Sequence, residues 1–192
     1  MIAAMLIMTA FPLMGLLTVT AGADMSHMRT MHDFSPADQT VSWRTINDTV
    51  MGGVSASRFL VRDGVGTFTG DVSLENYGGF ASVRSTPREY KLRGFDGIAL
   101  RVRTDGKTYK FRARTSAAFD GVSYQVSFRA DGDGWSTVKL PFSKFRPTWR
   151  GRVLTDRPPL DPAAIRALGF LISDKQEGSF RLDIDWIKAS RD

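Results

Sequence analysis

The sequence predicts an all-β fold, a jelly-roll-like antiparallel β-sandwich with one short helical turn. In short runs, Val, Ile, Phe, Tyr and Thr alternate with polar residues, as they do where a strand buries one face. Clusters of Gly, Asp or Pro separate these runs roughly every ten residues, which is typical of strands joined by turns. With 192 residues, 42% of them hydrophobic, the chain can bury one sizeable core but not two.

The alternation predicts ten strands, more than a single open antiparallel sheet usually holds. Two facing sheets with a shared core allow every strand to bury one face and solvate the other. The predicted strands cover residues 41–46, 58–62, 65–74, 80–84, 97–103, 108–115, 122–130, 135–140, 169–173 and 180–188.

One helical turn is expected before the strand at 169–173. Asp161 can cap it, Pro162 suits the first helical position, and residues 163–168 are good helix formers. The period of two also predicts which side chains share a face. It places inward Val122, Tyr124, Val126 and Phe128 of one strand and Leu182, Ile184 and Trp186 of another, and leaves outward Arg181, Asp183 and Asp185.

Residues 1–23 are expected to be a signal peptide or an N-terminal anchor. Residues 2–19 carry no charge, and the small residues Ala21-Gly22-Ala23 suit cleavage by a signal peptidase. A cleaved leader predicts an exported protein, periplasmic or secreted. A retained anchor, or a cytoplasmic protein whose true start is Met25, Met28 or Met31, are the alternatives.

Residues 24–39 are predicted to be a polar linker, and residues 40–190 to form the sandwich. His27 and His32 both fall in this linker and are expected to belong to a flexible tail. The chain has no cysteine, which excludes disulfides, thiolate metal sites and cysteine nucleophiles. We therefore expect no metal, no cofactor and no histidine base within the fold.

The net charge of +6 favours acidic partners in general but names none. Nucleic acid is not expected, because no run of five Lys or Arg residues occurs. Around the Asp105-Gly106 turn, a basic ladder on one sheet face is predicted, and it consists of Arg101, Arg103, Lys110, Arg112 and Arg114. It is either a solvated face paired with acids such as Asp183 and Asp185, or a concave docking surface for an acidic partner.

The densest motif is Asn47-Asp48-Thr49-Val50-Met51-Gly52-Gly53-Val54-Ser55. Asn and Asp suit a tight turn, and adjacent glycines permit backbone angles that a Cβ would forbid. The alternative is a polar loop whose amide and carboxylate meet a ligand. Neither a phosphate loop nor a nucleophile elbow fits, because no Gly-Lys-Ser/Thr and no Gly-x-Ser-x-Gly is present here.

This motif resembles the opening motif of the complex I intermediate-associated protein family. Four later stretches, LENYGGFASVR at 74–84, YQVSF at 124–128, LPFSKF at 140–145 and DKQEG at 174–178, are similar to that family in order and spacing. The resemblance covers roughly residues 40–190. It implies a galactose-binding-like sandwich with no established catalytic activity, whose eukaryotic members help to assemble respiratory complex I in mitochondria.

The candidate ligand- or partner-binding residues are Asn47, Asp48, Arg84, Gln125, Trp149 and Arg150. The two arginines can meet a carboxylate or a sugar hydroxyl, or pair with Asp48 or Asp174. Trp43, Trp135 and Trp149 can stack on sugar rings or lie in the core, and Trp149 is the best candidate for exposure.

We therefore expect a non-catalytic accessory or assembly factor with a protein partner, such as respiratory-complex subunits, and with membrane association only through the leader. A carbohydrate-binding module is the alternative. A hydrolase that uses Asp183 and Asp185 is the least supported hypothesis, because carboxylates two residues apart are common on solvated strands.

Overall fold

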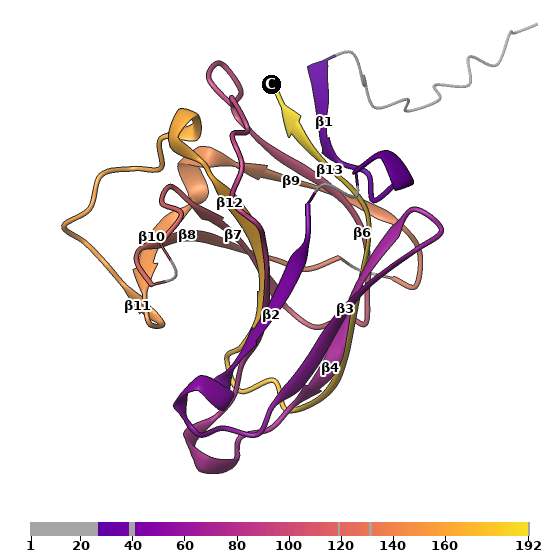
Figure 1. Ribbon diagram of the computed structural model, residues 1–192, viewed down its shortest axis with the longest axis vertical. Coiled ribbons are helices and arrows are strands. Elements are labelled where there is room, and N and C mark those ends of the chain that lie inside the picture. Colours follow the sequence, from indigo (N-terminus) through magenta and orange to yellow (C-terminus); the bar gives the residue numbers. More distant parts are fainter. Residues whose placement is uncertain (1–26, 39–40, 119, 131, 192) are drawn as a thin grey trace, which may run out of the picture.

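Two antiparallel sheets packed face to face form the molecule (Figure 1). The computed structural model describes residues 27–38, 41–118, 120–130 and 132–191, so the leader predicted over residues 1–23 lies outside the described residues. Sheet A has the order β3-β4-β13-β6-β9, and β1 also pairs with β13. Its strands are β1 (Met28–His32), β3 (Ala56–Arg62), β4 (Val65–Val72), β6 (Gly97–Thr104), β9 (Ser136–Pro141) and β13 (Gly178–Ser190).

Sheet B has the order β11-β10-β8-β7-β12-β5-β2. Its strands are β2 (Trp43–Asn47), β5 (Ala81–Ser85), β7 (Tyr109–Arg114), β8 (Ser123–Phe128), β10 (Arg146–Trp149), β11 (Arg152–Val153) and β12 (Ala167–Ile172). All ten predicted strands are confirmed to within two residues at each end, and β1, β10 and β11 were not predicted. The all-β sandwich predicted from the alternation is thus confirmed.

The described helices are single 3₁₀ turns. They are η2 (Pro36–Asp38), η3 (Asp48–Met51), η4 (Glu75–Tyr77), η5 (Phe142–Lys144) and η6 (Pro162–Ala164). Asp161 caps η6 as predicted, since its side chain accepts a 2.9 Å hydrogen bond from the Ala163 amide. The turn is shorter than expected, because β12 already begins at Ala167. No helix of the described residues has the length and apolarity that crossing a membrane requires.

An aromatic cluster fills the core between the sheets. The ring of Phe170, on β12, lies 5.3 Å from that of Phe111, 6.1 Å from that of Trp43 and 6.4 Å from that of Phe128. Tyr124 and Phe128 are buried, as the alternation predicted. Trp43 connects this layer to sheet A, because its ring lies 5.0 Å from that of Phe59 on β3.

Strand β13 departs from the regular alternation. Its register with β6 shifts between Ile184 and Trp186, so Asp185 is an extra residue in the strand. The prediction that Trp186 points inward is therefore wrong: Ile187 takes the core position, and Trp186 is half-buried with its ring 4.5 Å from the Lys188 Nζ.

The linker prediction is wrong for residues 28–38. Strand β1 pairs with the end of β13, and Met31 and Phe34 are buried in the core. The sequence there lacks a clear period because the register shifts between Thr30 and His32, which turns two neighbouring side chains inward. These residues are therefore part of the sandwich.

His32 is a buried core residue, which corrects its prediction as a tail histidine. Its Nδ1 lies 3.0 Å from an Asp38 carboxylate oxygen, and its Nε2 lies 2.9 Å from the Tyr90 hydroxyl. Burial lowers the pKa of His32 below its usual range, and it outweighs the opposing charge and hydrogen bond of Asp38. Burial likewise raises the pKa of Tyr90 to about 12.

Stability is expected to fall as the pH is lowered from about 6.5, the ordinary pKa of histidine. Below that pH the unfolded chain takes up a proton that the folded His32 resists, so each pH unit costs up to about 1.4 kcal/mol until the folded pKa is passed. Urea unfolding at pH 7.5 and pH 5.5 measures this difference. The difference should shrink in His32→Gln and persist in the control His27→Gln, and an unchanged difference in His32→Gln would contradict the assignment.

Candidate functional site

The motif at residues 47–55 forms η3 and the turn into β3, at one end of the sandwich. The turn that holds η4 lies beside it, at the bottom of Figure 1. These two loops connect β2 to β3 and β4 to β5, so they join both sheets.

Asp48 is fully buried and holds the two loops together. One carboxylate oxygen accepts a 3.0 Å hydrogen bond from the Ser55 amide. The other accepts hydrogen bonds from the amides of Gly79 at 2.7 Å and Phe80 at 3.2 Å, and from the Ser55 hydroxyl. Burial alone would raise the pKa of Asp48, but these hydrogen bonds outweigh it and lower that pKa. The carboxylate is thus occupied within the fold, as in the structural-turn interpretation.

Residue 53 must be glycine because it lies against the Asp48 carboxylate. A Cβ at residue 53 would lie 2.5 Å from the carboxyl carbon of Asp48, which is closer than nonbonded atoms approach. Asn47 is also engaged, because its side-chain oxygen accepts a 2.6 Å hydrogen bond from the Ser57 hydroxyl. The polar residues of the motif therefore build the loop.

The clamped loops present apolar side chains to solvent. Val50 and Met51 of η3 are 64% and 65% exposed, Val54 is 48% exposed, and Tyr77 of η4 is fully exposed. We call these four residues the apolar tip. They were not predicted, although three aliphatic side chains and a tyrosine inside polar, glycine-rich turns were a usable signal.

The predicted single basic ladder does not exist, because its residues lie on different sheets. Arg101 and Arg103 belong to β6 of sheet A, where they pair with Asp185 at 3.1 Å and Asp183 at 2.8 Å. Lys110, Arg112 and Arg114 belong to β7 of sheet B, and β6 pairs with β13 and β9 instead of β7. The pairing with acids is confirmed for the β6 arginines.

Asp183 lies on the outer face, as predicted, but its carboxylate is covered. Arg103, Arg181 and the Thr67 hydroxyl donate hydrogen bonds to it. Burial alone would raise the pKa of Asp183, yet these donors outweigh it and hold the pKa below its usual range. A carboxylate that is occupied in this way is a poor acid or nucleophile for glycoside hydrolysis.

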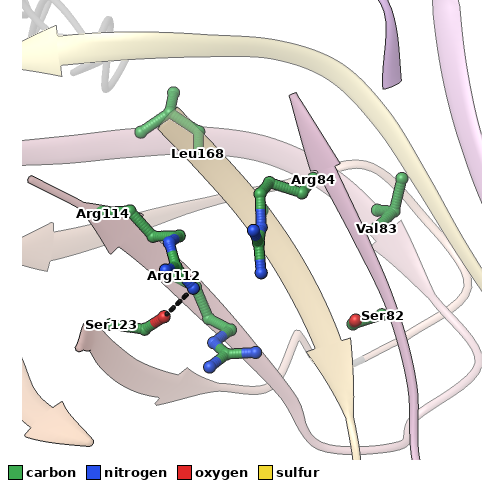
Figure 2. Close-up of a pocket in the computed structure, with 8 residues that line it drawn as sticks. Ser82, Val83, Arg84, Arg112, Arg114, Ser123 and Leu168 are labelled. Atoms are coloured by element: carbon green, nitrogen blue, oxygen red, sulfur yellow. Dashed lines mark hydrogen bonds between the residues drawn. The ribbon is translucent and has the colours of Figure 1, made fainter. Parts of the chain in front are cut away.

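Three arginines cluster on the outer face of sheet B, where Arg84 of β5 joins Arg112 and Arg114 of β7. Together with Ser82, Ser123 and Gly169 they line a small hollow (Figure 2). Burial, reinforced by the charge of the neighbouring arginines, lowers the pKa of Arg84 and of Arg112 to about 10. Both remain cations at neutral pH.

The remaining candidates lie around this cluster. Gln125 of β8 is directly opposite Arg112. Trp149 is 41% exposed, as predicted, and its indole nitrogen donates to Asp120 at 3.2 Å. Arg150 donates to the same carboxylate at 2.9 Å.

The structure therefore brings Arg84, Arg112, Arg114 and Gln125 onto one face, and it leaves Asn47 and Asp48 in the end loops. Asp48 and Asp174 were the acids expected to pair with Arg84 and Arg150, and that expectation is wrong. Asp48 accepts hydrogen bonds from the end loops, and Asp174 pairs with Lys110 at 2.7 Å. Within the described ranges, no group of three or more His, Asp or Glu side chains is arranged to hold a metal ion.

Residues 32–184 match the family model of complex I intermediate-associated protein 30. The mouse mitochondrial protein of that name is 37% identical over 102 residues, which are 51% of this chain and 31% of the mouse protein. A probable mitochondrial member from Caenorhabditis elegans is 28% identical over 148 residues, which are 67% of this chain and 44% of the relative. The matches thus span less than half the length of these relatives.

A similar solved structure is the family 11 carbohydrate-binding module of Clostridium thermocellum in complex with a mixed-linked tetrasaccharide. It has a TM-score of 0.62 and 16% identity, and the alignment covers 86% of this chain and 96% of the module. At this identity the likeness establishes the shared sandwich fold alone.

The relatives correct the predicted location. Both are named mitochondrial, which contradicts the expectation, drawn from the apolar leader, of a periplasmic or secreted protein.

Proposed function

Because the chain belongs to the complex I intermediate-associated protein 30 family, we propose that it is a non-catalytic accessory protein that binds subunits of a respiratory complex during assembly. We further propose that the apolar tip, Val50, Met51, Val54 and Tyr77, is its docking surface. The observation that carries this proposal is the exposure of these side chains on loops fixed by the buried Asp48.

Exposed apolar area and rigid loops both favour docking at the apolar tip. Large apolar side chains gathered on a protein surface leave water when a partner covers them, and buried apolar area is a main driving force of association. The hydrogen bonds of Asp48 hold the loops in place, so little conformational entropy is lost on docking. Tyr77 has the large, amphipathic ring that is enriched among residues that dominate binding energies.

The double variant Met51→Ser, Tyr77→Ser is expected to lower the recovery of respiratory-complex subunits about tenfold or more, since loss of two interface anchors costs at least about 1.4 kcal/mol. The measurement is affinity purification of the tagged full chain from detergent-solubilised membranes, with quantification of the co-purified subunits by mass spectrometry.

Leu60→Ser, Val61→Ser is the matched control, because it removes two exposed apolar side chains of β3 outside the apolar tip. Thermal unfolding should show that both variants remain folded. Equal recovery with both variants would reject the apolar tip as the docking surface. Absence of respiratory subunits from the unaltered protein's eluate would reject the assembly role itself.

Carbohydrate binding, the alternative from the sequence, has support only from the fold of solved structures. Saturable retention of the unaltered protein on a glycan array would support carbohydrate binding.

A further inference from the structure

The register of sheet B aligns four arginines across the sheet. Arg44 of β2 is opposite Arg84 of β5, Arg84 is opposite Gly169 of β12, and Gly169 is opposite Arg112 of β7. Gln125 and Arg146 continue the same row on β8 and β10. Directly opposite residues of a sheet share a face, and none of these six is acidic. We call this set the arginine row.

A glycine interrupts the arginine row at its middle. Gly169 has no side chain, and a Cβ there would lie 2.5 Å from the Val83 carbonyl oxygen. Figure 2 shows the Arg84 side chain lying across β12 at this point, with its guanidinium directed toward Arg112 and Arg114. The three arginines and Gly169 therefore line the same hollow.

Within the part of the chain that the structure describes, Arg112 and Arg114 each retain an unused hydrogen-bond donor. The Nε atoms of Arg112 and Arg114 are buried and have no hydrogen-bond partner among the described residues. Arg114 donates instead to two neutral groups, the Ser123 hydroxyl at 3.2 Å and the Ala118 carbonyl at 3.1 Å. Asp120 is the acid whose charge acts on Arg84 and Arg114, but Arg150 and Trp149 already hold its carboxylate.

We propose that Arg84, Arg112 and Arg114 form a binding site for a small phosphate-type oxyanion, either free phosphate or the terminal phosphate of a small molecule. Three like charges close together in a half-buried hollow repel one another, and a dianion among them removes that repulsion. Guanidinium forks match the oxygens of phosphate in geometry and charge. The hollow is too small for a polymer, and a phosphate would enter it only as the flexible arginine side chains move apart.

Calorimetric titration of the full chain with inorganic phosphate tests the proposal, with sodium chloride holding the ionic strength constant. We expect saturable binding with a Kd of about 1 mM or tighter. Arg112→Met should weaken that binding about tenfold or more, because it removes one charged fork from the site. Glycerol phosphate in a parallel titration separates a terminal phosphate from the free ion.

Arg62→Met is the matched control, because Arg62 is an exposed arginine of β3 in sheet A. It removes the same net charge without touching the hollow. If circular dichroism shows that Arg112→Met is unfolded, Arg84→Lys replaces it, since lysine keeps the charge and loses the fork.

Weaker phosphate binding in Arg112→Met, or in its replacement Arg84→Lys, with binding retained in Arg62→Met, supports the site. No saturable binding of phosphate or glycerol phosphate, or equal weakening in both variants, overturns it. Binding of a polyglutamate peptide without binding of either phosphate also overturns it, and assigns the face to an acidic protein.

Discussion

Replacing Asp48 with alanine is expected to lower the free energy of unfolding by about 3–5 kcal/mol. The substitution leaves the amides of Ser55, Gly79 and Phe80 without their acceptor in a buried site. Each unsatisfied buried donor costs about 1–3 kcal/mol, and the vacated volume adds to that cost. Urea unfolding followed by circular dichroism gives the difference.

Asp71→Ala is the control, because Asp71 is an exposed aspartate on β4, near the same end of the sandwich. A change of about 0.5 kcal/mol or less is expected there. Asp48→Asn keeps one acceptor oxygen and should fall between the two. A loss below about 1 kcal/mol in Asp48→Ala would show that the loops are held by other contacts.

Phe170→Ala is expected to destabilise the protein by about 3–5 kcal/mol, the range measured for large-to-small changes in tightly packed cores. Phe170 is completely buried, and its ring packs against Trp43, Phe111 and Phe128 from three strands of sheet B. Removal of the ring leaves a cavity that the flanking strands cannot close without losing their register. The midpoint and slope of the urea unfolding curve together give this change in the free energy of unfolding.

Leu60→Ala serves as the comparison, since Leu60 is 39% exposed on β3. It should cost about 1 kcal/mol or less, because little apolar area is lost from the interior. A similar small cost for Phe170→Ala would mean that the core around Phe170 is packed more loosely than its ring distances indicate.

Local patterns in the sequence determined the strands and most of their faces. The period of two is a property of each strand alone, so Tyr124, Phe128, Leu182 and Ile184 were correctly placed in the core. The Asp161 cap was equally predictable, because it depends on residues within one turn. The family followed from ordered motifs and was confirmed over residues 32–184.

The remaining features of the fold were decided by pairing between strands that are distant in sequence. Strand β1 has little pattern of its own and forms because the end of β13 offers it hydrogen bonds. The extra residue Asp185 moved Trp186 out of the core, since a bulge reverses the alternation beyond it.

The candidate site depended on tertiary structure in the same way. The sequence supplied the basic residues, but adjacency in the chain suggested one ladder, whereas β6 and β7 belong to different sheets. Only the strand order places Arg84 beside Arg112, with Gly169 between them. Alternation fixes whether a side chain faces inward or outward, while hydrogen bonds between distant strands fix its neighbours, and the chemistry of this protein's surface follows from those neighbours.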